Sequence, residues 1–194
     1  MSEAFTIKMQ GKGETATRLG KLYQDGRLPL GLHSALAKAV ADKVKAHLKL
    51  RDHTHANRLG GKRSHFYFQA AESVQGAPTT DGAEVTINKL GLRQRWLGGT
   101  IRAKNAKLLA IPARAEAYGV SPRNFPGDLR FIKFRSGAMA LVKVGGPRSR
   151  TAGLVEYWLK EEVYQFPDPT VLPSPAELID AASEATGDYL SQNE

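Results

Sequence analysis

Apolar residues in the first quarter of the chain follow a strand period and then a helix period. Residues 4–9 alternate apolar and polar side chains, which predicts a strand. Residues 14–25 are predicted to form a short helix, and residues 26–29 end it. Beyond this break, apolar side chains recur at every fourth position, which predicts a long helix with one buried face: Leu32, Leu36, Val40, Val44 and Leu48.

The middle of the chain changes from a helical to a strand period. Ser64 is predicted to cap a second helix that runs to about Val74, and residues 75–82 are predicted to form a loop. Alternation over residues 84–88 predicts a strand, and residues 107–113 predict another. Prolines and glycines in residues 115–127 indicate a long connection that is exposed or ordered by a partner.

The next segment is predicted to form an antiparallel pair of strands. Residues 128–135 and 138–144 flank Ser136 and Gly137, which we expect to be a two-residue hairpin link. Residues 145–153 form a basic loop in this prediction, and residues 154–165 form the last strand.

The C-terminal segment is predicted to be a stiff linker followed by a helix. Prolines at 167, 169 and 173 favour an extended linker, and Ser174 with Glu177 forms a capping box that begins a helix to about Leu190. An isolated helix of this length is marginal in water, so we expect it to dock on its own domain or on a neighbouring subunit. The expected contact residues of this arm are Leu178, Ala182 and Tyr189.

These elements predict an α+β fold. An antiparallel sheet packs with the N-terminal helices in one domain, residues 1–165, and a C-terminal helix on a Pro-rich linker forms an arm, residues 166–194.

Composition and charge limit the classes of function. The 194 residues include no Cys, which excludes disulfides, thiolate metal sites and cysteine nucleophiles. No apolar run is long enough to cross a bilayer and the N-terminus lacks a secretory pattern, so we expect no membrane partner. The net charge of +9 divides into +7 over residues 1–75, +10 over residues 76–150 and −8 over residues 151–194.

A basic body with an acidic C-terminal segment has three interpretations. The body binds nucleic acid while the tail competes for it, or body and tail meet across a subunit boundary, or the charges are simply solvated.

Candidate catalytic chemistry is sparse. His53, His55 and His65 are the clustered metal-type residues, but surface histidines are the favoured interpretation because a metal site usually needs three or four convergent ligands. The glycine-rich turns lack the spacing of a phosphate-binding loop, and the middle of the chain offers no close carboxylate pair. We therefore expect no catalytic residue, no cofactor and no metal.

A basic stretch with interleaved aromatic residues is the remaining candidate site. It is interpreted first as a contact surface for other subunits, and second as a DNA-facing surface. The simpler alternative is that Trp96 and Phe125 fill a core while the arginines pair with acidic groups of the same or another subunit. The candidate residues are Arg93, Arg95, Trp96, Arg102, Lys104, Lys107, Arg114 and Arg123.

The same stretch resembles a known family. Residues 91–105 (GLRQRWLGGTIRAKN), 108–113 (LLAIPA) and 116–119 (EAYG) are similar to segments of the phage virion morphogenesis proteins of Mu-like phages and prophages, a tail-completion group. Residues 59–66 (LGGKRSHF), 125–131 (FPGDLRF) and 136–142 (SGAMALV) are similar too. The resemblance covers roughly residues 50–190.

The resemblance implies a structural protein rather than an enzyme. It implies an α+β domain of the tail-completion or neck type, which forms a homo-oligomeric ring at the head-to-tail junction or at the top of the tail. We expect a hexamer, although the sequence is equally compatible with a twelve-fold ring. The implied partners are neighbouring tail and head-joining proteins and passing DNA, in the virion and in the host cytoplasm during assembly. The alternative is a basic accessory protein that binds nucleic acid.

Overall fold

The computed structural model describes residues 5–9, 29–54, 59–60, 63–145 and 153–192. It is mixed α+β, as predicted. The helix predicted at residues 14–25 and most of the basic loop predicted at residues 145–153 lie outside the described residues. The chain divides into two compact units: unit 1 holds residues 1–54, 65–97 and 167–194, and unit 2 holds residues 55–64 and 98–166.

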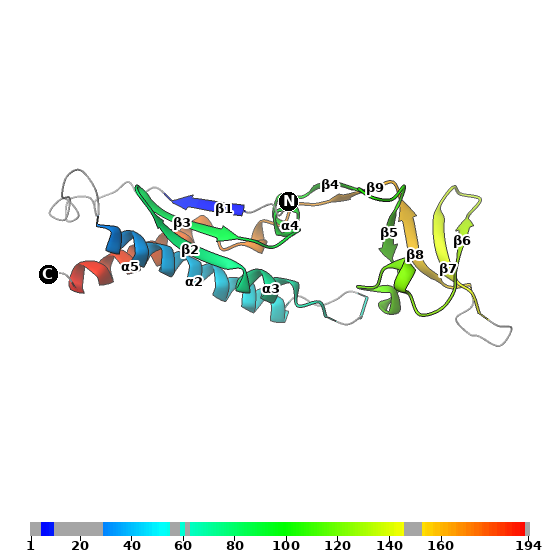
Figure 1. The fold of residues 1–194 in the computed structure, drawn as a ribbon, viewed down its shortest axis with the longest axis horizontal. Coiled ribbons are helices and arrows are strands. Elements are labelled where there is room, and N and C mark those ends of the chain that lie inside the picture. Colours follow the sequence, from blue (N-terminus) through cyan, green and yellow to red (C-terminus); the bar gives the residue numbers. More distant parts are fainter. Residues whose placement is uncertain (1–4, 10–28, 55–58, 61–62, 146–152, 193–194) are drawn as a thin grey trace. The chain divides into compact units, whose positions relative to one another are not determined.

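Unit 1 places helices against a three-stranded antiparallel sheet (Figure 1). The sheet order is β1 (Phe5–Met9), β3 (Gly82–Ile87) and β2 (Val74–Thr79). The helices are α2 (Leu30–Thr54), α3 (Phe66–Glu72), α4 (Leu92–Leu97) and α5 (Pro175–Gln192), with the short 3-10 helix η3 (Pro169–Val171).

The every-fourth-position stripe of α2 forms the core of unit 1, as predicted. Val40, Val44 and Leu48 are buried in one cluster with Tyr67 of α3 and Ile87 of β3. The strand predicted at residues 4–9 and the strand predicted at residues 84–88 are also confirmed, because β1 pairs with β3 in antiparallel register.

The loop predicted at residues 75–82 is wrong, because this segment forms strand β2 and its turn into β3. Pro78 pairs with Ala83 near the turn, and β2 is an edge strand, where a proline is tolerated. Gly76 has a specific role, since an added Cβ there would lie 2.4 Å from the carbonyl oxygen of Ala37 on α2. The glycine that suggested a loop instead lets α2 approach the sheet.

The N-terminal cap of α3 also differs from the prediction. His65, not Ser64, occupies the cap position, with a left-handed backbone (φ 48°) and no side-chain cap bond. Asp52 at the end of α2 replaces that cap: its Oδ1 accepts from the Phe68 backbone N–H at 3.3 Å, and its Oδ2 lies 2.9 Å from His65 Nδ1. Sequence rules for helix caps consider only residues next to the helix start, so they cannot predict a cap supplied by another helix.

Unit 2 consists of a two-stranded ribbon and a four-stranded antiparallel sheet. The ribbon pairs β4 (Gly99–Arg102) with β9 (Glu162–Gln165). The sheet has the order β5 (Leu109–Pro112), β8 (Val155–Lys160), β7 (Met139–Lys143) and β6 (Leu129–Lys133). The single strand predicted over residues 154–165 is therefore two strands, which separate at Glu161 and pair in different sheets.

The predicted hairpin is confirmed as β6 and β7, but its link is longer than two residues. The Phe134 N–H donates to the Ala138 carbonyl at 2.8 Å, and the Gly137 N–H donates to the Phe134 carbonyl at 2.9 Å. Gly137 has φ 84°, so the loop is a turn closed by a left-handed glycine.

The long connection at residues 115–127 is more structured than predicted. It contains the 3-10 helices η1 (Ala115–Ala117) and η2 (Pro122–Asn124). Ala117 and Phe125 are buried against Tyr157 of β8, whose hydroxyl donates to the Val120 carbonyl at 2.9 Å. The connection thus forms part of the core of unit 2, where Phe125 and Tyr157 meet edge to face.

The predicted capping box begins α5. The Ser174 N–H donates to Glu177 Oε2 at 2.9 Å, and the Glu177 N–H donates to Ser174 Oγ at 3.3 Å. The preceding segment docks on unit 1 instead of extending, since Val171, Leu172 and Pro173 are buried. The structure therefore differs from the expected boundary at residue 165, because residues 167–194 complete the core of unit 1.

Candidate functional site

The basic stretch expected to form one contact surface is divided between the two units. Arg93, Arg95 and Trp96 lie on α4 in unit 1. The other five lie in unit 2: Arg102, Lys104, Lys107, Arg114 and Arg123. Each unit is therefore considered separately.

Arg95 and Trp96 have structural contacts inside unit 1. The Arg95 guanidinium lies 4.0 Å from the ring centroid of Phe66, and its Nη1 donates to the Tyr67 hydroxyl at 3.3 Å. Trp96 packs against the core cluster. The Asp168 backbone N–H donates to the carbonyls of both residues, at 3.1 and 3.2 Å, which fastens the C-terminal segment to α4. Trp96 therefore matches the simpler alternative, a core role, whereas Arg95 contacts aromatic rings rather than the acidic group that this alternative expected.

Arg102 pairs with Glu162 across the two-stranded ribbon. Its Nε and Nη2 lie 2.8 and 2.7 Å from Glu162 Oε2, and the two residues are direct cross-strand partners. Both side chains are more than half exposed, so the pair adds only about 0.5 kcal/mol.

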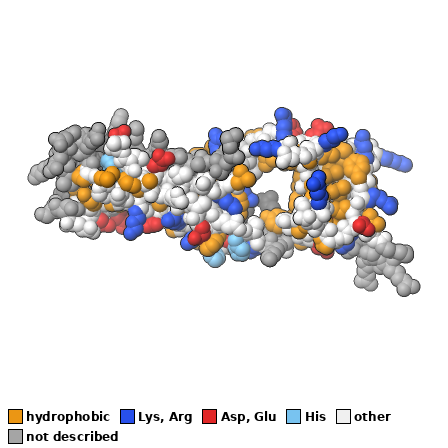
Figure 2. Space-filling view, viewed as in Figure 1, with side chains coloured by type: hydrophobic (Ala, Val, Ile, Leu, Met, Phe, Trp, Pro, Cys, Tyr) orange, Lys and Arg blue, Asp and Glu red, His pale blue; other side chains and the backbone are white. Residues whose placement is uncertain are grey.

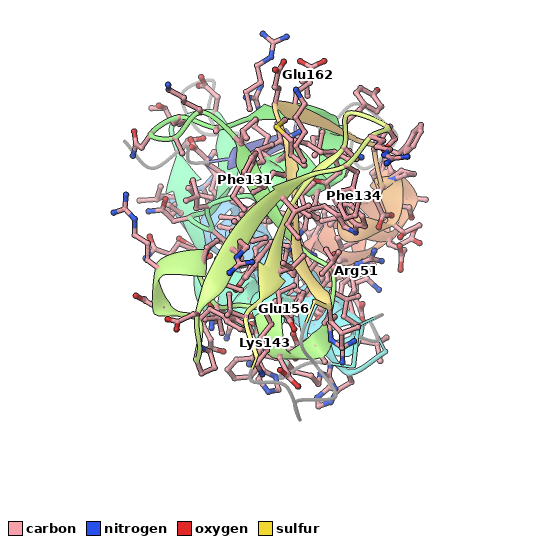
Figure 3. All side chains as sticks on the ribbon, turned by 90° about the vertical axis from the view of Figure 1, so that its right-hand side faces the viewer. Arg51, Phe131, Phe134, Lys143, Glu156 and Glu162 are labelled. Carbon is pink, nitrogen blue, oxygen red and sulfur yellow. The ribbon has the colours of Figure 1, made fainter. Side chains whose placement is uncertain are left out.

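Arg114 faces a buried carboxylate. Its Nε lies 3.8 Å from Glu156 Oε1, and the Glu156 side chain is 0% exposed. Neither Glu156 oxygen accepts a hydrogen bond from the part of the chain that is described, and Arg114 Nε likewise has no acceptor there. Burial raises the pKa of the adjacent Tyr157 hydroxyl, and the Glu156 charge raises it further. Figure 3 shows Glu156 and Lys143 at the same end of the four-stranded sheet.

The remaining predicted residues of unit 2 are exposed cations. Lys104, Lys107 and Arg123 make no ion pair with another described residue. Strand and hairpin positions that the prediction did not single out share this property: Arg130, Lys133, Arg135 and Lys160. The sequence feature that could have identified these four residues is the density of Lys and Arg, since unit 2 has 15 Lys and Arg against 5 Asp and Glu.

Exposed aromatic side chains accompany these cations on the four-stranded sheet. Phe131 is 53% exposed, Phe134 38% and Trp158 39%. Figure 2 shows hydrophobic side chains gathered over this sheet with Lys and Arg side chains around them. Phe131 and Phe134 lie on opposite sides of β6 (Figure 3). Phe134 and Trp158 share one face of the sheet, and large apolar side chains that stay exposed within a basic surface are typical of a protein-binding face.

The predicted arm residues contact the same chain. Leu178 is buried in the core cluster of unit 1, and Ala182 packs against it. Tyr189 lies against Gly31 of α2, where an added Cβ would be 2.9 Å from the Tyr189 hydroxyl. Of the two docking positions considered from the sequence, the structure places α5 on its own unit.

The histidine cluster does not form a metal site in the described part of the chain. His65 bonds Asp52, His53 is exposed, and His55 lies outside the described residues. Among residues that the structure describes, no three His, Asp or Glu side chains come close enough together to hold a metal ion. None of the helices described combines the length and apolar character that a membrane crossing requires.

No protein-family model, curated protein or solved structure matches this chain. The resemblance to the tail-completion group therefore rests on the segments quoted above. The site itself is a basic and aromatic sheet surface on unit 2, which can bind a partner by apolar contact and charge.

Proposed function

We propose that this chain is a structural protein of a phage virion, which assembles with copies of itself into a ring at the neck or at the top of the tail. The observation that carries the proposal is the division of charge between the units. Unit 2 has a net charge of +10, whereas the last segment of unit 1, residues 167–194, holds six acidic residues and no basic one. Opposite charges on different parts of one chain favour a heterologous contact, which closes into a ring when the rotation allows it.

The proposal gives the chain a scaffolding role and no catalytic one. Its partners are further copies of itself, expected as a hexamer, together with the neighbouring tail and head-joining proteins. Assembly takes place in the host cytoplasm and the product resides in the virion. The resemblance over residues 50–190 supports this placement.

Electron microscopy of the purified full chain tests the proposal. In negative stain at about 0.1 M salt, where charge still acts over about 10 Å, we expect closed rings of uniform size with a central channel. Particles of the single 21.1 kDa chain at every concentration would overturn self-assembly into a ring.

Nucleic-acid binding is the second candidate, and the exposed cations of unit 2 favour it. Each phosphate contact made by a Lys or Arg adds about −0.9 to the slope of log affinity against log salt concentration. A monomer that binds duplex DNA with a slope of several units would favour this function. A slope near zero would show that the cations make no phosphate contacts, and it would favour a role in protein contacts.

A further inference from the structure

One face of the four-stranded sheet carries a compact group of apolar side chains. The register places Ile132 of β6 opposite Ala140 of β7, Ala140 opposite Trp158 of β8, and Trp158 opposite Ile111 of β5. Directly paired residues lie on the same face of a sheet. Phe134, two residues beyond Ile132, completes the group, since its ring lies 5.8 Å from the Trp158 ring. We call these five residues the aromatic patch; Phe134 and Trp158 are its exposed members, Ile111 and Ile132 are half-buried, and Ala140 is buried.

Cations surround the aromatic patch without acidic partners among the described residues. Arg130 alternates with Ile132 and so lies on the same face, and Arg135 follows Phe134 in the hairpin loop. Lys160 ends β8 and pairs with Leu109. The acidic residues closest in sequence to Lys160 are Glu161 and Glu162, and Glu162 is already paired with Arg102.

The outer face of α5 has the complementary character. Asp180, Glu184 and Asp188 are exposed at four-residue intervals; Asp180 and Glu184 lie away from the side on which Leu178 is buried, whereas Asp188 lines a groove with Lys38 of α2. None of the three makes an ion pair with another described residue. Like charges at this spacing destabilise an isolated helix, so a basic partner would offset the repulsion between these carboxylates.

The two surfaces also match in size. Asp180 and Asp188 are eight residues apart on a helix, or about 12 Å along its axis. The aromatic patch extends from β6 to β5, three strand spacings or about 14 Å. A helix lying across these strands therefore brings its carboxylates to the cations at the margins of the aromatic patch.

We infer that the aromatic patch of one copy of this chain binds the acidic outer face of α5 of a second copy. The inference rests on the proposed function and names the contact that would build the ring. Trp and Arg are the side chains most enriched among residues that dominate interface affinity, and Trp158 and Arg130 would serve as such anchors. Because the two surfaces differ, each copy offers one of each, and the assembly is head to tail.

Two charge-reversal variants of the full chain test the inference. One carries Arg135→Glu and Lys160→Glu at the aromatic patch, and the other carries Asp180→Lys and Glu184→Lys on α5. Each should weaken self-association by at least about tenfold, because attractions become repulsions. Native mass spectrometry of the two variants mixed in equal amounts should then show ring-sized oligomers again, in which the two variants alternate, because the acidic patch of one variant meets the basic helix of the other and the two intact surfaces also meet.

Single charge reversals outside both surfaces serve as controls. Lys133→Glu, on the face of β6 opposite to Ile132, and Asp81→Lys in unit 1 are exposed positions, and each should leave the assembly unchanged. Wild-type rings that persist in both test variants would overturn the inferred contact while the proposed ring function stands. A wild-type chain that stays monomeric would overturn both.

The absence of native Cys gives an independent readout. Phe134→Cys and Gly187→Cys variants, mixed under oxidising conditions, should form a disulfide-linked dimer that combines the two variants, since Gly187 is exposed and lies three residues after Glu184 on the acidic side of α5. If each variant crosslinks only with itself, the head-to-tail contact is wrong.

Discussion

Glu156 is a fully buried carboxylate beside Arg114 in unit 2, and its oxygens accept no hydrogen bond from the described residues. Removing one member of a buried ion pair leaves an uncompensated charge, which usually costs more than the pair contributes. Arg114 therefore stabilises unit 2 chiefly because, without it, the buried Glu156 carboxylate would have no opposite charge beside it.

A double-mutant cycle tests this account of Glu156. Arg114→Ala should lower the free energy of unfolding by roughly 2 kcal/mol, less than for a fully buried pair because the Arg114 side chain is 40% exposed. The same substitution in a Glu156→Gln background should cost less than about 1 kcal/mol, measured by chemical denaturation. Arg123→Ala, an exposed control, should change stability by no more than about 0.5 kcal/mol. Equal losses from Arg114→Ala in both backgrounds would contradict the coupling.

Glu177 makes the start of α5 dependent on pH. Hydrogen bonds from the Ser174 backbone N–H, and then from its hydroxyl, lower the pKa of Glu177 from its usual 4.5. A lowered pKa means that the ionised carboxylate stabilises the fold above the unfolded pKa, and that this contribution is lost as pH falls through the lower folded pKa.

Glu177→Gln should therefore reduce the melting temperature near neutral pH, and its difference from the wild type should shrink in acid. Melting curves followed by circular dichroism from about pH 7 to about pH 3 measure the effect. Glu184→Gln, on the exposed face of the same helix, should not reduce the melting temperature at neutral pH, because it relieves like-charge repulsion. A Glu177→Gln deficit that stays constant with pH would argue against the capping role.

At the scale of elements, periodic and locally capped segments could be predicted, whereas features set by distant partners could not. The stripe of α2 and the capping box of α5 are confirmed because their signals lie within a few residues. Strand β2 was missed because Gly76 and Pro78 resemble loop residues until α2 and β3 are placed beside them. The aromatic patch was missed because Phe134 and Trp158 meet only through strand pairing.

Because α2 approaches β2 closely at Gly76, a substitution there should change the stability of the protein strongly. Gly76→Ala should lower the free energy of unfolding by about 2–3 kcal/mol, because the new methyl group meets backbone that must move. Gly187→Ala is the matched control: it lies in α5 with nothing within 4 Å of the added atom, and it should raise stability by about 0.5–1 kcal/mol. Equal effects at the two glycines would contradict the packing of β2 on α2.

At the scale of the whole molecule, net charge divides between the two units of the structure rather than between the segments 1–75, 76–150 and 151–194. Unit 2 is strongly basic, and unit 1, with 13 Lys and Arg against 14 Asp and Glu, is nearly neutral. The sequence predicted an acidic arm that could reach a neighbour, but α5 belongs to the core of unit 1 through Leu178. Removing residues after Phe166 would damage unit 1 itself, so point substitutions on the outer face of α5 are the sound test.

The central claim is that oppositely charged surfaces of successive copies hold the assembly together. Sedimentation of the intact chain at about 0.1 M and about 1 M salt tests it most directly, since the screening length falls from about 10 Å to about 3 Å between them. We predict a closed oligomer at low salt that dissociates toward the 21.1 kDa chain at high salt. A single 21.1 kDa species at both concentrations, or an oligomer indifferent to salt, would contradict the claim.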